Sequence, residues 1–545
     1  MRCRLGLLLS LLWLFPFPAN GQTSTRGETL YTTQVRFTAE NIPILSVGIM
    51  DGQDRIQFTA GGPLRILPDG PDGMSVLPPG ARTWTARLEA NTTSAVVHYR
   101  IQIDDLPSGD LEKLQAARRS WQERGVTVRP KEFGSVFGFF GKVMDTRRIA
   151  LTTEHVYEDR DAAEQASAQI ARQHSVDTRV IPVLKERPHG TIVLTDGRTT
   201  IQSNDAIWFE PVRNDGSILV RRVEHGRGFR WHGHEDRRYR GILYVTVDRA
   251  GKLAIGNMLN SETLLRGLVP TEIFPSAPQA ALRAQAVAAR GELLAKLGHR
   301  HLADPYQICS DVHCQAYTGT RREDPRTDRA IEATSGRMLF HNHQLVDTVY
   351  SASCGGHTEH NDLVWGTTPD ETLRGRPDGN VSLGEPTEDA VRAWVTGRPA
   401  SYCGTTSYGA SSFRWVDQVQ SSEVRQSLQG QGIELGPIQA MRVLQRGVSG
   451  RAISLEISDR SGRSTTVNGE LRIRRLLGGL KSALFVIEAD TSEGSPPRSF
   501  RFIGGGFGHG VGMCQTGAIG MAEASKSFDE ILRAYYLDSS IERIY

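Results

Sequence analysis

The chain has 545 residues, which is too long for one ordinary hydrophobic core and predicts two or three domains. Its hydrophobic content of 39% and charged content of 23% are typical of a globular protein. The formal net charge of +3 is nearly balanced over this length, so composition gives no argument for binding nucleic acid, and we expect no nucleic-acid partner.

The N-terminus has the pattern of a cleaved secretory signal. Arg2 and Arg4 precede an apolar stretch at residues 5–17, and small residues follow before Gln22. We therefore predict a signal peptide at residues 1–21. The apolar stretch is too short to span a bilayer with margin, and no later apolar stretch reaches about 18 residues. The sequence thus predicts an exported protein of the periplasm or cell wall with no transmembrane segment.

Two small regions follow. Residues 22–95 contain short alternating runs broken by glycine and proline turns, which predicts a β-rich segment or linker. Residues 96–185 show a β-α-β pattern twice, which predicts a small ferredoxin-like domain. This second region faintly resembles the SPOR domain, whose family binds peptidoglycan glycan strands stripped of peptides. A small α+β spacer without a ligand is the alternative.

The strongest predicted helix covers residues 276–297. Ser276 and Gln279 form a capping-box pattern, Pro278 lies in the first turn, and Gly298 follows the last turn. Apolar residues recur at helical spacing and make one face rich in alanine. This prediction places Glu272 in the turn before the helix. Near the C-terminus, Ser527 and Glu530 form a second capping-box pattern.

Five cysteines remain after signal cleavage, and an odd number in an oxidising compartment implies a free thiol or a shared metal. They are Cys309, Cys314, Cys354, Cys403 and Cys514. Cys309 and Cys314, with His301 and His313 nearby, could bind structural zinc or close a small disulfide loop, and the spacing leaves both open. A disulfide between Cys354 and Cys403 is a further expectation.

Residues 504–515 have a glycine at almost every second position around His509. If this run is extended, Gly506, Gly508, Gly510 and Gly512 share one face, and His509 lies on the other. A face made of glycine lets another backbone or a ligand approach closely. The register is not that of G-x-G-x-x-G and no lysine follows as in a P-loop, so a nucleotide site is disfavoured.

The same run resembles the closing signature of the SpoIID/LytB family, and the agreement continues through Gly517 to Tyr535-Tyr536. Further blocks lie in the family's order, so that the resemblance covers roughly residues 190–545. These blocks are Tyr239-Arg240-Gly241, residues 265–272, residues 282–290, Gln315-Ala316-Tyr317, residues 350–358 and Leu480-Lys481-Ser482.

The resemblance implies an α+β fold in which a large mixed domain, residues 186–545, carries a cleft bordered by a helix. It also implies a lytic transglycosylase that cleaves peptidoglycan between N-acetylmuramic acid and N-acetylglucosamine. The family's catalytic glutamate lies in its V-P-x-E block, which here gives Glu272. A single carboxyl group can suffice, because the C6 hydroxyl of the muramic sugar is the nucleophile and closes a 1,6-anhydro ring. A hydrolase normally uses two carboxyl groups. The resemblance also requires a raised pKa for Glu272, and Ile273 and Phe274 are the apolar neighbours expected to raise it.

Weaker assignments concern the residues around this acid. Arg290 could face the cleft or form an ion pair. The other expected substrate-binding residues are Gln315, Tyr350, Ser353, His509 and Gln515. Cys354 and Cys514 depart from the family's usual small residues, which places a disulfide or metal beside the site. No cofactor is required by this chemistry.

A second function also fits the resemblance. Some relatives are named as enhancers of a cell-wall amidase, so the chain could instead bind peptidoglycan strands without cleaving them and activate an amidase partner. The sequence contains neither H-E-x-x-H nor G-x-S-x-G, which argues against a zinc protease or an α/β-hydrolase.

Overall fold

The computed structural model describes residues 30–545 except 69, 79, 81, 140–141, 175, 177, 214–215, 227–231, 312–313, 367 and 491–494. The predicted signal peptide, residues 1–21, lies outside the described residues. Helices and several separate sheets make up the molecule, which confirms the α+β class. Within the described part of the chain, no helix combines the length and apolar character needed to cross a membrane.

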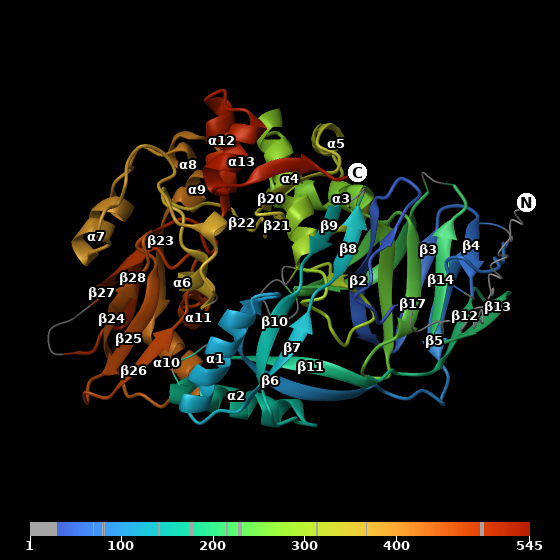
Figure 1. Cartoon of the computed structure of the whole chain (residues 1–545), viewed down its shortest axis with the longest axis horizontal. Coiled ribbons are helices and arrows are strands. Elements are labelled where there is room, and N and C mark those ends of the chain that lie inside the picture. The colour runs from blue at the N-terminus through green and yellow to red at the C-terminus, as the bar shows by residue number, and fades with distance from the viewer. Residues whose placement is uncertain are drawn as a thin grey trace, which may run out of the picture.

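Two sheets on one side of the molecule mix early and late segments of the chain (Figure 1). The first has the order β1-β2-β18-β17-β14-β4, and β19 pairs with β2. Its strands are β1 (Arg36–Phe37), β2 (Pro43–Gln53), β18 (Leu253–Asn260), β17 (Ile242–Val247), β14 (Ala206–Pro211), β4 (Leu64–Leu67) and β19 (Ile308–Cys309). The second has the order β13-β12-β5-β3-β15-β16. Its strands are β13 (Thr200–Asn204), β12 (Thr191–Thr195), β5 (Thr83–Leu88), β3 (Arg55–Ala60), β15 (Ile218–His225) and β16 (Gly233–Tyr239).

The β-rich segment predicted at residues 22–95 does not stand apart from the large domain, although the small domain, residues 96–186, lies close to its predicted bounds. β2 pairs along most of its length with β18, and β5 pairs with β12, so residues 36–88 are built into the large domain. The physical reason is burial. The inward side chains of β3, such as Ile56 and Phe58, are fully buried in a core that also holds Leu282 and Leu293 of the long helix.

The small domain is an insertion between these strands, and its ferredoxin-like fold is confirmed. Its four main strands form an antiparallel sheet in the order β11-β6-β10-β7, which places the two β-α-β halves side by side. The elements are β6 (Val96–Pro107), α1 (Leu111–Glu123), β7 (Val128–Phe133), β10 (Arg148–Thr153), α2 (Arg160–His174) and β11 (Arg179–Glu186). An extra hairpin, β8 (Val136–Phe139) and β9 (Lys142–Asp145), carries Phe137 and Met144 into the core of the large domain.

A helical layer joins the two halves of the large domain. It contains α3 (Ser261–Glu272), α4 (Gln279–Ala295), α5 (Pro325–Ala333), α12 (Gln515–Glu523) and α13 (Phe528–Tyr535). The long helix α4 is buried from Ala281 to Leu294 with little interruption, because the other helices of the layer pack around it. Short strands complete the layer: β20 (Arg337–His341), β21 (Gln344–Leu345) and β30 (Ser540–Arg543) form one sheet, and β22 (Tyr350–Ser351) pairs in parallel with β29 (Met513–Cys514).

The predicted start of the long helix is wrong by three residues. α4 begins at Gln279 with Pro278 as its N-cap, and no side chain caps it. Gln279 donates its amide to the carbonyl of Arg326 instead of forming the predicted capping box with Ser276. The predicted box of Ser527 and Glu530 is confirmed at the start of α13, where both reciprocal hydrogen bonds form.

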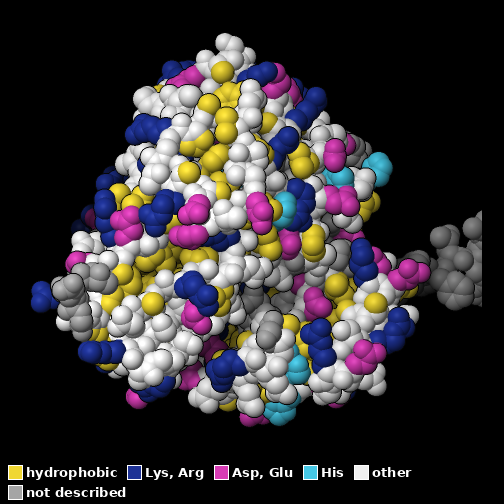
Figure 2. Space-filling model, turned by 90° about the vertical axis from the view of Figure 1, so that its left-hand side faces the viewer, with side chains coloured by type: hydrophobic (Ala, Val, Ile, Leu, Met, Phe, Trp, Pro, Cys, Tyr) yellow, Lys and Arg dark blue, Asp and Glu magenta, His cyan; other side chains and the backbone are white. Residues whose placement is uncertain are grey.

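The remaining part of the chain forms a second lobe, drawn in orange at the left of Figure 1. Two three-stranded sheets, β23-β28-β27 and β24-β25-β26, enclose a separate apolar core. Their strands are β23 (Arg414–Gln420), β24 (Ile438–Arg446), β25 (Ala452–Asp459), β26 (Ser464–Asn468), β27 (Phe485–Ala489) and β28 (Ser499–Gly505). The helices of this stretch of the chain are α6 (Asn361–Trp365), α7 (Glu388–Thr396), α8 (Tyr402–Thr405), α9 (Ala410–Phe413), α10 (Ser421–Gln429) and α11 (Glu470–Leu476). Of these, α8 packs against α12 of the helical layer. The side of the molecule that Figure 2 turns toward the viewer carries basic and acidic side chains intermingled.

The glycine-rich run is not extended, which corrects the prediction of alternating faces. After β28 ends at Gly505, the glycines at 506, 508, 510 and 512 all have positive φ values between 69° and 98°. Glycine adopts this left-handed backbone without the steric cost that a side chain would add. The run is therefore a coiled ribbon, which we call the glycine ribbon (residues 506–512), and it leads into β29.

Candidate active site

Glu272 is the last residue of α3, so the prediction that it lies in a turn is wrong. α3 begins after Asn260, whose side chain accepts a hydrogen bond from the backbone amide of Thr263, and it continues through Pro270. The backbone becomes extended at Ile273, which ends the helix. The carboxyl oxygen Oε1 of Glu272 accepts a hydrogen bond of 3.2 Å from the backbone amide of Ala316. Its side chain is partly accessible to solvent although protein atoms crowd it on most sides.

The surroundings of Glu272 favour its protonated form. Burial, followed by the nearby carboxylate of Glu292, raises the pKa of Glu272 from 4.5 to about 7. The amide of Ala316 and the charge of Lys296 act in the opposite direction and do not cancel this effect. A carboxyl group with a pKa near neutrality can both donate and accept a proton at neutral pH. Of the two apolar neighbours expected to raise this pKa, only Ile273 is buried. Phe274 is 51% exposed and packs against Tyr408.

Glu292 on α4 is a second carboxylate that the sequence analysis missed. It forms an ion pair with Lys296 one turn later and accepts a hydrogen bond of 2.6 Å from the side-chain amide of Gln315. The i,i+4 spacing of Glu292 and Lys296 is typical of an ion pair on a solvent-exposed helix face. For this reason nothing in the sequence indicated that Glu292 lies near Glu272. The signal that could have revealed it is its position inside the alanine-rich helix, where a charged residue must find partners.

Three predicted substrate-binding residues lie around these two carboxyl groups. Gln515, at the start of α12, donates its amide to the carbonyl of Glu272 at 2.9 Å and to Gln285 at 3.1 Å. Gln315 binds Glu292, and the buried hydroxyl of Tyr350 interacts electrostatically with both Glu272 and Glu292. Helices α3, α4 and α12 and strand β22 therefore converge on one polar centre.

Polar atoms near this centre have unused hydrogen-bonding capacity. Among the described residues, several buried side-chain atoms lack a protein partner: Nε2 of Gln285, Oε1 of Gln315, Oγ of Ser351 and Oγ of Ser353. Buried polar groups in folded proteins are normally hydrogen-bonded to protein, water or ligand. A polar ligand or ordered water is thus the expected partner of these atoms.

Two other predicted substrate-binding residues have mainly structural contacts. Arg290 is 0% exposed and forms a bidentate ion pair with Glu262 at 2.8 and 2.9 Å, so the ion-pair alternative is the one that the structure contains. Nδ1 of His509 accepts a hydrogen bond of 3.0 Å from the amide of Val511, and its ring interacts with the backbone of Tyr350. Burial, together with Arg451 and Arg474, lowers the pKa of His509 to about 3, which keeps the imidazole neutral.

The predicted metal-binding residues come together. The ligand atoms of His301, Cys309 and Cys314 all lie within 4.8 Å of one another. Nε2 of His301 is 3.4 Å from the sulfur of Cys314, and Nδ1 of His301 lies 2.9 Å from a carboxylate oxygen of Asp304. A carboxylate that holds the second ring nitrogen is typical of histidine ligands of zinc. His313 lies outside the described residues.

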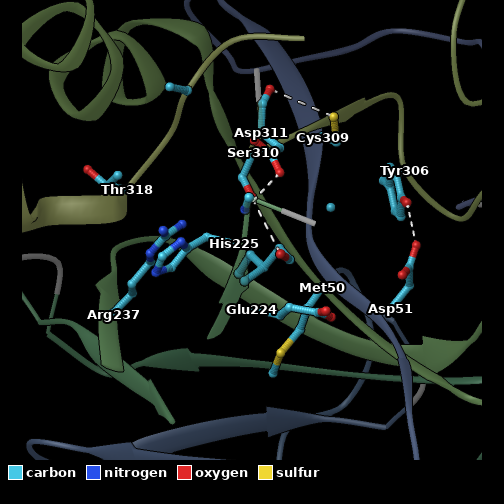
Figure 3. Close-up of a pocket in the computed structure, with 14 residues that line it drawn as sticks. Met50, Asp51, Glu224, His225, Arg237, Tyr306, Cys309, Ser310, Asp311 and Thr318 are labelled. Atoms are coloured by element: carbon cyan, nitrogen blue, oxygen red, sulfur yellow. Dashed lines mark hydrogen bonds between the residues drawn. The ribbon is translucent and has the colours of Figure 1, made fainter. Parts of the chain in front are cut away.

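A cavity of about 290 Å³ lies beside both groups (Figure 3). Its lining includes Cys309 of the triad and Ala316, whose amide holds Glu272. Acidic and basic side chains face it, among them Asp51, Glu224 and Arg237, and Tyr306 donates its hydroxyl to Asp51 at 3.0 Å. Strands β2, β15 and β16 supply half of this lining, and none of the lining residues on them lies in a sequence motif, which is why the motifs did not reveal the cavity.

Comparisons with known proteins agree with this arrangement. Residues 249–341 match the family described as Stage II sporulation protein, and residues 364–512 match a domain of unknown function. The family match holds Glu272, Glu292, Gln315 and the His-Cys-Cys triad, and it is narrower than the predicted range of 190–545.

Three curated relatives extend beyond that domain. An uncharacterized protein of Brachyspira hyodysenteriae is 24% identical over 67% of this chain and 85% of its own length. The Amidase enhancer of Bacillus subtilis is 25% identical over 50% of this chain, but the match covers only 39% of that protein. Stage II sporulation protein D of Bacillus subtilis is 22% identical over 54% of this chain and 78% of its own length.

Proposed function

Because the chain carries a domain of the SpoIID family, we propose that it cleaves the glycan strands of peptidoglycan as an exported lytic transglycosylase. The observation that carries this proposal is the environment of Glu272. The burial of this residue and its proximity to Glu292 raise its pKa to about 7, which suits a group that must donate and then accept a proton.

The reaction then needs only one acid. Protonated Glu272 gives its proton to the glycosidic oxygen between N-acetylmuramic acid and N-acetylglucosamine, and the bond from that oxygen to C1 of the muramic sugar breaks. The Glu272 carboxylate next takes the proton of the C6 hydroxyl, whose oxygen bonds to C1 and closes the 1,6-anhydro ring. Glu272 ends protonated, so the cycle balances without water.

The neighbouring residues have supporting roles in this proposal. Glu292 forms an ion pair with Lys296 and accepts a hydrogen bond from Gln315, which holds its carboxylate where it can stabilise the positive charge that develops at C1. Gln515 fixes the end of α3 by binding the carbonyl of Glu272. The unpartnered atoms of Gln285, Ser351 and Ser353 are available for sugar hydroxyl or acetamido groups.

A metal fits the His-Cys-Cys triad. One imidazole and two thiols are ligands that zinc accepts, and Asp304 already orients the imidazole. His301, Cys309 and Cys314 would hold the ion, and it would supply structural order to the loop at residues 301–318. That loop also provides the Ala316 amide that binds Glu272.

The small domain fits binding to strands that have lost their peptides. A cavity of about 460 Å³ on its sheet has four basic residues in its lining, Arg100, Arg129, Lys131 and Lys185, against one acidic residue, Glu158. Removing the stem peptide from N-acetylmuramic acid exposes a lactyl carboxylate on each such sugar. A basic sheet face would therefore attract stripped strands through these carboxylates.

The test is an assay of product ends. The purified chain should release 1,6-anhydromuramoyl ends from stripped glycan strands, and Glu272→Gln should reduce the rate by at least about 10³-fold, because one residue supplies both proton transfers. Glu530→Gln is the matched control, since Glu530 caps the exposed start of α13, and it should retain the wild-type rate. Reducing ends without the anhydro ring would contradict the proposed reaction.

The second candidate is a non-catalytic enhancer of a cell-wall amidase, and the named relative of Bacillus subtilis favours it. In that case Glu272→Gln would bind stripped strands and stimulate an amidase as well as the wild type does. Measuring amidase rates with both proteins separates the two functions.

A further inference from the structure

Four side chains that could hold a metal ion meet close to the candidate active site, where the sequence analysis left a disulfide or a metal open for Cys354 and Cys514. They are Cys354, Asp378, Cys403 and Cys514, and all four are buried. Their ligand atoms lie within 4.8 Å of one another. They come from four separate segments: the turn after β22, the loop at 378, helix α8, and the end of β29 at the start of α12.

The spacing of the sulfurs fits a shared metal better than the predicted disulfide. The sulfurs of Cys354 and Cys403 are 3.7 Å apart. Two thiolates bound to one tetrahedral zinc, each about 2.3 Å from it, lie about 3.8 Å apart. A disulfide needs about 2.05 Å. The expectation of a bond between Cys354 and Cys403 is therefore not met, and the distance is that of two corners of a zinc tetrahedron.

The backbone and side chains around the cluster donate hydrogen bonds to two of its candidate ligands, Cys514 and Asp378. The sulfur of Cys514 accepts hydrogen bonds from the backbone amides of Cys354, at 3.1 Å, and Gly517, at 3.3 Å. Asp378 accepts one from the amide of Cys403 at 2.7 Å and another from the hydroxyl of Tyr535. Backbone amides stabilise a thiolate, and ligating carboxylates are themselves normally hydrogen-bonded.

Two arginines near the cluster, Arg451 and Arg414, carry positive charges that an anionic metal cluster would balance. Arg451 is fully buried and donates to the carbonyls of Cys354 and His357, and Arg414 donates to the carbonyl of Gly355. Within the described part of the chain, neither guanidinium forms an ion pair with a carboxylate. Zinc held by three thiolates and one carboxylate carries a net charge of about −2, which two arginines would balance.

We propose that Cys354, Asp378, Cys403 and Cys514 bind a structural zinc ion in a closed, tetrahedral site. With three thiolates and one carboxylate, the protein fills every position, so the ion takes no part in chemistry. Its role is to fix the segments that carry Ser353 and Gln515, the sequence neighbours of Cys354 and Cys514. This site also accounts for the odd cysteine count, because three cysteines enter one cluster and two enter the His-Cys-Cys triad.

Zinc content of matched variants of the full chain tests the site independently of activity. The protein is purified from zinc-supplemented cells, and its bound zinc is measured by native mass spectrometry and elemental analysis. Cys403→Ser and Asp378→Asn should each lose one equivalent of zinc relative to the wild type. Cys309→Ser is the matched control, because it alters only the triad and should retain the ion at Cys403.

X-ray absorption of the wild-type protein keeps the test decisive even if a variant does not fold. In Cys309→Ser protein, or in wild type if the triad is empty, the zinc spectrum should show three sulfur neighbours and one oxygen neighbour. A folded wild-type protein without zinc would overturn the proposal. So would zinc that disappears in Cys309→Ser alone, or an intact mass two hydrogens lower with Cys354 linked to Cys403.

Discussion

At the residue scale, Glu272 is an acid whose properties come from its neighbours. It lies on a helix end, its carboxyl oxygen is held by the Ala316 amide, and Glu292 lies close enough to raise its pKa. The resemblance of its V-P-T-E block to the family motif is what pointed to this residue. Its burial and its second carboxyl neighbour depend on α3 and α4 being packed side by side, which the motif does not encode.

This environment predicts a pH-dependent stability. The folded-state pKa of Glu272 is about 7 and its ordinary value is 4.5, so the folded chain binds the proton more tightly than the unfolded chain. The resulting stabilisation is fully present below pH 4.5 and is lost as the pH rises to about 7. The loss is up to about 3 kcal/mol in the free energy of unfolding.

Glu272→Gln removes this titration, since glutamine stays neutral. Denaturant unfolding of the two proteins at pH 5 and pH 8 should show the variant gaining stability relative to wild type at the higher pH. If the difference in unfolding free energy between variant and wild type is the same at pH 5 and pH 8, the pKa of Glu272 is not raised. This measurement needs no substrate, so it checks the acid separately from its activity.

At the scale of elements, the glycine ribbon (residues 506–512) shows why glycine recurs there. Gly512 has a φ of 69°, and a Cβ at this position would lie 2.1 Å from the carbonyl oxygen of Val349. Gly510 has a φ of 79°, and its Cβ would meet the guanidinium of Arg451 at 2.3 Å. The ribbon therefore packs directly against the residue before β22 and against the buried Arg451. Only glycine fits at positions 510 and 512 without a shift of these neighbours.

Gly512→Ala should therefore destabilise the protein by more than the left-handed backbone alone explains. Gly432→Ala is the matched control, because Gly432 has a φ of 73° but open space around its Cβ position. The control should cost about 1 to 2 kcal/mol, and Gly512→Ala should cost clearly more, as measured by thermal or denaturant unfolding. Equal costs would show that the ribbon can move away from Val349.

At the scale of the whole molecule, the inserted small domain is attached to the large domain by more than its two connections. The β8-β9 hairpin enters the main core, and His299 lies 2.6 Å from the carbonyl of Thr146. The basic cavity of its sheet is therefore held in a fixed position relative to the domain that carries Glu272. A strand bound there would be presented to the same molecule's active site.

Reversing charge on this sheet tests the binding role of the small domain. The double variant Lys131→Glu, Lys185→Glu should bind stripped peptidoglycan at least about tenfold more weakly in a sedimentation assay, with the loss greatest at low salt. The same measurement on peptide-bearing strands shows whether the sheet distinguishes the two, since their lactyl carboxyl groups are amide-linked to the stem peptide. Unchanged retention on stripped strands would favour the spacer alternative for residues 96–185.

The sequence by itself determined the elements and the residues whose pattern is local. The ferredoxin-like insertion and the cap of α13 follow from periodicity and capping, which are written in neighbouring residues. The choice of Glu272 as candidate acid came from the family resemblance of its V-P-T-E block and stays a prediction. The sequence also brought Cys309, Cys314 and His301 into one hypothesis, because they are close along the chain.

Only the tertiary structure decided what depends on segments far apart. It built residues 36–88 into sheets with residues 191–260, brought Glu292 to Glu272, and gathered Cys354, Asp378, Cys403 and Cys514 into one cluster. It also paired Arg290 with Glu262 in the core. The physical reason is that burial and electrostatic contact depend on distance in space, and no local pattern specifies which distant strand or helix will supply the partner.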